Sequence, residues 1–272
     1  MFCLVEGSAV LREQHADIVV PWWSFTKTLI AAAVMRLART GEIDLDQPSS
    51  GGRATPRSLM RHEARVPDYG GVAAYHAAVA ASEAPWPMDR LLAEAGEAEV
   101  PAWSYSNIGY ARLRARVEDR RGPDALADLV LKPLGLNARV ARRPQDLDGV
   151  VMGSAEGYHP GWVYHGLVVG SVREAALALD GLPGLVGADD WAEMARPTPL
   201  PQFNRPPWAL AAYGGGLMTP QMSDGRMVLG HTGGGPGSGI AVYRLGGRSA
   251  AVFALDEGRS KVETEAVRLL TA

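Results

Sequence analysis

Strand-like segments occur at both ends of this chain, and mainly helical segments lie between them. Near the N-terminus, residues 2–11 and 18–20 are rich in β-branched and apolar side chains, which predicts a short pair of strands. Near the C-terminus, glycine-rich turns separate further strand-like runs at residues 227–230, 240–245 and 250–255. The pattern predicts an α/β (α+β) fold in which both ends of the chain build one antiparallel sheet, with a helical lobe inserted.

The helical signals begin directly after the first strands. Residues 26–40 are dense in Ala and Leu, and Gly41 is placed to end that helix. An amphipathic helix is predicted to close the chain over residues 261–272. The other predicted helices, separated by prolines, are residues 75–82, 88–95, 108–121, 123–132 and 172–182.

These signals divide the chain into three stretches that act as one functional unit. Residues 1–48 are expected to form the first part of the sheet lobe, with one helix. Residues 49–205 are expected to form the helical lobe, and residues 206–272 the second part of the sheet lobe.

Charge and cysteine content exclude several classes of protein. A formal net charge of −3 gives no basic surface for neutralising phosphates, so we expect no nucleic-acid partner. The single cysteine, Cys3, excludes an internal disulfide, and no stretch approaches the roughly 20 apolar residues of a membrane span. No signal peptide is recognisable, so we expect a cytoplasmic protein, although a chain trimmed of its leader would look the same. A homo-oligomer is left open.

The first motif with chemical content is Ser24-x-x-Lys27, at the start of the Ala-rich helix. Residues i and i+3 share a helix face, so the Lys27 amine can lie beside the Ser24 hydroxyl. A serine hydroxyl becomes a good nucleophile only when a base takes its proton. By itself, the motif fits equally a helix cap followed by an exposed lysine.

Two later motifs add polar groups of the kinds that acyl transfer uses. Tyr105-Ser106-Asn107 precedes a predicted helix; a tyrosine hydroxyl can relay protons, and an asparagine amide can orient a carbonyl. The run His231-Thr232-Gly233-Gly234 ends a strand-like segment, where glycines let a substrate approach closely. Taken singly, the first also fits a capped turn, and the second a glycine-rich turn.

Together and in this order, the three motifs resemble those of the class C β-lactamase family in its broad sense, which includes esterases and D-amino-acid peptidases. Residues 132–136 resemble the family's Pro-Leu-Gly landmark, and residues 213–217 one of its closing strands. Residues 62–69 depart from the family's usual His-Thr-Ser-Gly-Leu-Pro. The resemblance implies a two-lobed fold like that of β-lactamases and penicillin-binding proteins.

The resemblance also implies a mechanism that needs no cofactor and no metal. Ser24 would form an acyl-enzyme after losing its proton to Lys27 and Tyr105. The backbone amides of Ser24 and Gly234 would hold the oxyanion, and Asn107 would orient the substrate.

His231, Thr232 and Gly233 would lie along the far end of the substrate. Lysine is common at the His231 position in relatives that bind a substrate carboxylate. A mostly neutral histidine attracts an anion less. This favours a small ester, lactone or amide as substrate; a β-lactamase, a D-amino-acid or D,D-peptidase, and an idle ligand- or partner-binding member are the alternatives.

One aromatic segment has two interpretations. His159 and His165 flank it, but no nearby set of carboxylates or cysteines supports a metal site. Trp162 and Tyr164 lie between the two histidines and are expected either to wall a substrate pocket or to pack in the core.

Overall fold

The computed structural model describes residues 1–48, 52–96, 100–155, 157–256 and 258–272. Residues 49–51, at the start of the predicted helical lobe, are therefore outside the described residues. The strands are β1 (Phe2–Glu6), β2 (Ala9–Gln14), β3 (Val19–Pro21), β4 (Arg139–Ala141), β5 (Leu167–Ser171), β6 (Thr198–Pro199), β7 (Ala212–Tyr213), β8 (Leu229–Gly235), β9 (Ser238–Leu245) and β10 (Arg248–Leu255). The α-helices are α1 (Thr26–Arg39), α2 (Pro56–Met60), α3 (Ala73–Ala80), α4 (Met88–Ala95), α5 (Asn107–Arg121), α6 (Val172–Val186), α7 (Ala188–Ala195) and α8 (Arg259–Thr271).

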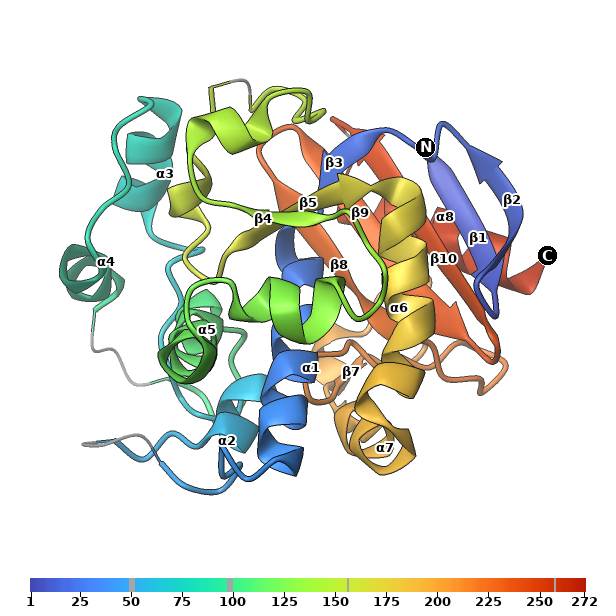
Figure 1. Cartoon of the computed structure of the whole chain (residues 1–272), viewed down its shortest axis with the longest axis horizontal. Coiled ribbons are helices and arrows are strands. Elements are labelled where there is room, and N and C mark those ends of the chain that lie inside the picture. Colours follow the sequence, from blue (N-terminus) through green and yellow to red (C-terminus); the bar gives the residue numbers. More distant parts are fainter. Residues whose placement is uncertain (49–51, 97–99, 156, 257) are drawn as a thin grey trace.

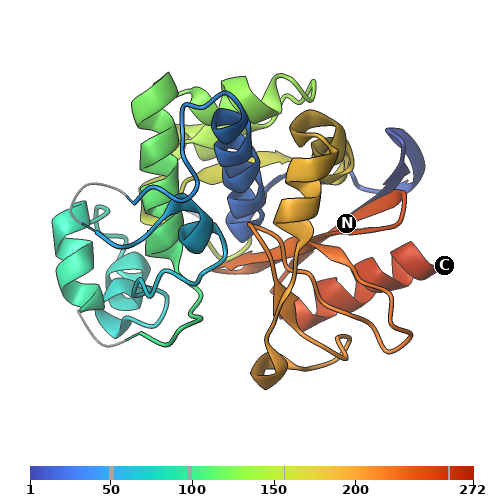
Figure 2. The ribbon, with the colours of Figure 1, turned by 90° about the horizontal axis from the view of Figure 1, so that it is seen from below.

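The central sheet joins the two ends of the chain, as the sequence predicts. It has five antiparallel strands in the order β2-β1-β10-β9-β8, and Phe2 of β1 pairs with Val252 of β10 (Figure 1). Alternating apolar side chains give the sheet two faces to bury. Figure 2 shows α8 on one face of the sheet and α6 and α1 on the other.

Helix α6 connects the predicted helical middle to the sheet. Its N-cap Ser171 and Glu174 form a reciprocal capping box, which satisfies backbone N–H groups that the first turn leaves open. The apolar side of α6, including Leu179 and Leu182, is fully buried. The division of the chain at residues 48 and 205 stays a prediction.

Two segments differ in detail from the predicted helices. Where one continuous helix is expected at residues 123–132, the structure has a π-helical turn, Ala127–Leu131, just before Pro133. The short strands β3 and β4 both pair with β5, which lies between them in a separate three-stranded sheet that the sequence does not predict. Among the described residues, no helix is both long and apolar enough to cross a membrane.

Candidate active site

The turn that contains Ser24 packs between α1 and the edge strand β8. Trp23 has a left-handed backbone (φ +40°), a conformation that costs a non-glycine residue on the order of 1–3 kcal/mol and persists only where its surroundings enforce it. The Trp23 indole nitrogen donates to the Ser238 hydroxyl of β9 at 3.0 Å. A Cβ added to Gly233 would lie 2.8 Å from the Ser24 backbone nitrogen, and one on Gly235 would collide with the Trp23 ring. The absence of side chains at Gly233 and Gly235 therefore leaves space for Trp23 and Ser24. The sequence does not predict this close packing.

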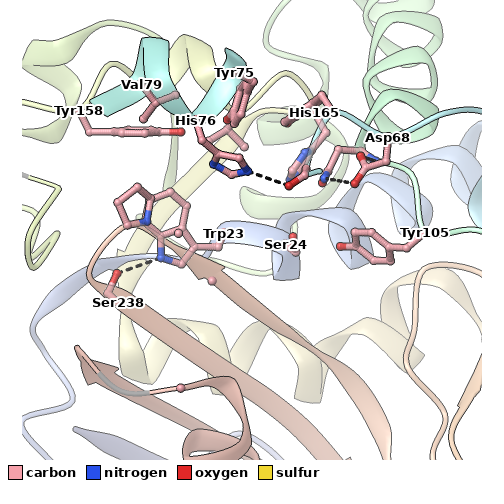
Figure 3. Close-up of a pocket in the computed structure, with 18 residues that line it drawn as sticks. Trp23, Ser24, Asp68, Tyr75, His76, Val79, Tyr105, Tyr158, His165 and Ser238 are labelled. Atoms are coloured by element: carbon pink, nitrogen blue, oxygen red, sulfur yellow. Dashed lines mark hydrogen bonds between the residues drawn. The ribbon is translucent and has the colours of Figure 1, made fainter. Parts of the chain in front are cut away.

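Ser24 and Lys27 are in direct contact. Lys27 Nζ lies within hydrogen-bond distance of Ser24 Oγ, at 2.8 Å, and the lysine is fully buried. The Tyr105 ring centroid lies 5.0 Å from Lys27 Nζ, and Figure 3 shows the Tyr105 hydroxyl directed toward Ser24. The structure therefore brings together the three residues that the sequence suggests for proton transfer and attack.

Asn107 is held at the start of α5 by an acid that the sequence analysis does not select. The Asp68 carboxylate accepts the Asn107 backbone N–H at 2.8 Å and its side-chain amide at 3.3 Å. Ser106, not Asn107, caps the helix, because its hydroxyl accepts the Gly109 N–H. Asp68 directly follows Pro67 in the segment that departs from the family's usual sequence, which is the one signal that could have found it.

Ser24, Tyr105 and Asn107 line one cavity of about 660 Å³, which Figure 3 shows in close-up, and Gly234 of β8 also lines it. Among the described residues that line this cavity there is one carboxylate, Asp68, and no lysine or arginine. His231, Thr232 and Gly233 are not among the residues that line this cavity.

His231 is buried and already engaged by the protein. Its Nε2 lies 3.0 Å from the Tyr213 hydroxyl, and its Nδ1 contacts the Thr232 carbonyl at 2.5 Å. The ring centroid lies 6.2 Å from that of Tyr105. His231 and Thr232 line an adjoining cavity on the other side of Tyr105.

Trp162 and Tyr164 pack beside the cavity that contains Ser24 but are not among its lining residues. The Trp162 indole donates to the Glu83 carbonyl, and the Tyr164 hydroxyl donates to the Trp86 carbonyl. Their rings belong to an aromatic cluster with Tyr75 and Trp86. Trp162 also lines a neighbouring cavity of about 700 Å³, and a substrate-binding role for these two side chains stays a prediction.

His165 is the residue that sequence reasoning missed. Its Nε2 lies 3.2 Å from Lys27 Nζ, and the imidazole lines the cavity. Burial lowers its pKa well below the usual range, and the positive charge of Lys27 lowers it further. His159 lies apart from it and accepts the Gly161 N–H instead. Within the described parts of the chain, no group of three or more His, Cys, Asp or Glu side chains is placed to hold a metal ion.

Two buried histidines near Lys27 should make the fold acid-sensitive. Burial is also the main cause that lowers the pKa of His62 well below its usual range, with Lys27 second. Both histidines are therefore neutral in the folded state, whereas in the unfolded chain they take up protons below about pH 6.5. The free energy of unfolding is therefore highest above that pH. It decreases as the pH falls, by up to about 1.4 kcal/mol per pH unit for each histidine.

The midpoint temperature of thermal unfolding should therefore decrease as the pH is lowered from 7 to 5. Replacing His62 by glutamine should flatten this dependence, and replacing the exposed His15 by glutamine should leave it unchanged. Equal slopes in all three proteins would contradict the assignment.

Comparisons with known proteins identify a family and several chains of similar fold. The model of the Beta-lactamase family matches residues 10–272. A D-stereospecific amidohydrolase from Streptomyces sp. is 22% identical, with a TM-score of 0.78 over 99% of this chain and 92% of that one. The D-amino acid amidase from Ochrobactrum anthropi SV3, complexed with D-phenylalanine, is 20% identical, with a TM-score of 0.81 over 99% and 96%.

A third solved structure is assembled from several chains. The octameric penicillin-binding protein homologue from Pyrococcus abyssi is 19% identical, with a TM-score of 0.79 over 99% of this chain and 72% of that one. A search of curated proteins gives no match.

Proposed function

The chain belongs to the Beta-lactamase family and is a serine hydrolase, and we propose that it cleaves small amides and esters, first of all amides of D-amino acids, through an acyl-enzyme on Ser24. The observation that carries this proposal is the buried contact of 2.8 Å between Lys27 Nζ and Ser24 Oγ at the floor of the cavity. Such a contact gives the hydroxyl a base within reach of its proton.

In the proposed acylation step, Ser24 Oγ forms a bond to the substrate carbonyl carbon while its proton passes to Lys27. The carbonyl π electrons move onto oxygen, where the Ser24 and Gly234 backbone amides receive the charge. Collapse of this intermediate breaks the bond to the leaving group, which takes the proton from Lys27 through the Tyr105 hydroxyl. Water then cleaves the acyl-enzyme by the same proton route in reverse.

The charges of the cavity favour a substrate with an ammonium group over one with a carboxylate. Asp68 places a negative charge next to Asn107, which we propose orients the substrate carbonyl. No lysine or arginine lines the cavity among the residues that the structure describes, and His231 is engaged by Tyr213 and Thr232. A penicillin carboxylate therefore finds no fixed cation here, whereas the ammonium group of an amino acid amide finds a carboxylate. The two amidohydrolases of similar fold are consistent with that substrate class.

Three substrates test this proposal: D-phenylalanine amide, its N-acetyl derivative and benzylpenicillin. We expect kcat/KM to be highest for the free amine. Acetylation should lower it by about 10- to 100-fold, because one hydrogen bond to a charged group is lost. Asp68→Asn keeps an oxygen for the Asn107 N–H but removes the negative charge. It should therefore reduce the difference in kcat/KM between the free and the acetylated amide. Equal turnover of the free and acetylated amides, or preferred cleavage of penicillin, would overturn the proposed substrate class.

A further inference from the structure

His165 is placed next to the proposed general base by the turn that leads into β5. The chain reverses at Gly166, which has a left-handed φ of +92°, and so directs the preceding imidazole inward against α1. His165 is 3% exposed and Lys27 is fully buried. Because no bulk water reaches a fully buried amine, its N–H groups need acceptors within the protein.

The titratable groups around this pair are histidine, arginine and tyrosine side chains. The charged or titratable groups that act on His165 are Lys27, Arg114 and His231, and each of them disfavours a positive imidazole. The rings of Tyr105 and Tyr110 lie on the other sides of the lysine, with centroids 5.0 and 5.8 Å from Nζ. Two cations 3.2 Å apart in such a buried site would repel each other strongly, so the imidazole is the neutral partner.

We infer that neutral His165 accepts a hydrogen bond from Lys27 through Nε2 and thereby fixes the lone pair of the amine toward the Ser24 hydroxyl. This inference rests on the proposed function. A neutral amine has two N–H groups and one lone pair. With one N–H directed to His165, the second N–H and the lone pair remain, and the orientation with the lone pair toward Ser24 is the one that can take the Ser24 proton as Oγ bonds to the carbonyl carbon.

The same hydrogen bond stabilises the charge that this transfer creates. When the Ser24 proton arrives, Lys27 becomes an ammonium ion and keeps its N–H on His165 Nε2. Hydrogen bonds from a charged donor are about twice as strong as neutral ones, so the contact strengthens as the transition state forms. His165 is therefore a positioning residue that acts through Lys27.

The tautomer of His165 tests this arrangement without any substrate. Long-range 1H–15N NMR of the wild-type protein should show a neutral His165 that carries its proton on Nδ1, from pH 8 down to pH 6. A proton on Nε2 would overturn the inference, because His165 would then donate to the lysine and occupy the lone pair that Ser24 needs.

Two variants of similar side-chain volume separate this hydrogen bond from packing. His165→Gln supplies an amide oxygen that can replace Nε2 as acceptor, whereas His165→Leu fills the space without an acceptor. Acylation by a fluorophosphonate probe should stay within about threefold of wild type for His165→Gln. It should slow by about 10- to 100-fold for His165→Leu, the range for losing one hydrogen bond to a charged group.

The pH profile of acylation gives a second readout. In His165→Leu the acidic limb should move to lower pH, because the ammonium form of Lys27 has lost its acceptor. The acidic limb of His165→Gln should not move. His159→Gln, which changes a histidine of the same segment outside the cavity, serves as the matched control.

The outcomes are distinguishable. Equal slowing of both His165 variants, or a normal rate and pH profile in His165→Leu, would overturn the inference while the proposed function stands. Failure of the wild-type protein to react with the probe would overturn the proposed function and the inference together.

Discussion

Replacing Ser24 with alanine is expected to abolish covalent labelling and to lower kcat/KM by about 10⁴-fold or more, as for other catalytic serines. The variant lacks the oxygen that bonds to the carbonyl carbon, so neither an acyl-enzyme nor a phosphonate adduct can form. Intact-mass spectrometry after exposure to a fluorophosphonate should show one adduct on the wild-type protein and none on Ser24→Ala.

The fold should survive this change. The Ser24 side chain is bonded to Lys27, while the turn around it is held by Trp23, Ser238 and the glycines of β8. The midpoint of thermal unfolding should therefore stay within a few degrees of wild type. An adduct that persists on a well-folded Ser24→Ala protein would place the reactive group elsewhere in the chain.

Replacing Lys27 with methionine should lower the rate of acylation by about 10²- to 10⁴-fold, the contribution that a general base commonly makes. Methionine has nearly the length and volume of the lysine stem, so it avoids the cavity that alanine would leave at this fully buried position. The Ser24 hydroxyl would remain in place but would have no amine to receive its proton. Stopped-flow labelling with the same probe would measure the loss.

Thermal unfolding of Lys27→Met shows whether slower acylation comes from the lost amine or from a disrupted fold. Unfolding of Lys27→Met by heat should be as cooperative as in the wild type, since an apolar chain replaces an amine in a buried site. Near-normal acylation by Lys27→Met would show that another group takes the Ser24 proton, even where Ser24 itself proves essential.

The parts of the site that the sequence predicts are those set by short spacings. Ser24 and Lys27 are three residues apart at the start of a helix, so their contact follows from helix geometry alone. The same holds for the main sheet, because alternating apolar runs predict strands wherever they lie in the chain. Both the two-lobed fold and membership of the family are confirmed.

The remaining contacts depend on how distant segments meet. His165 reaches Lys27 only because Gly166 reverses the chain before β5, and β5 itself is a short buried run with no alternation to mark it. Trp162 and Tyr164 have the composition of a pocket wall, but composition does not say which way a ring points. In the sequence, nothing distinguishes Asp68 from the other acidic residues, because its contact with Asn107 forms only when α5 packs beside it.

The joining of both chain ends in one sheet sets the order in which the enzyme can become reactive during its synthesis. Ser24 and Lys27 emerge from the ribosome well before β8 to β10, which complete the sheet beside β1 and contact the turn that carries Ser24. Contacts between segments so distant in sequence form late in folding, because the intervening chain must first be ordered. A nascent chain therefore carries its nucleophile without the strand that shapes it until β8 to β10 have been synthesised.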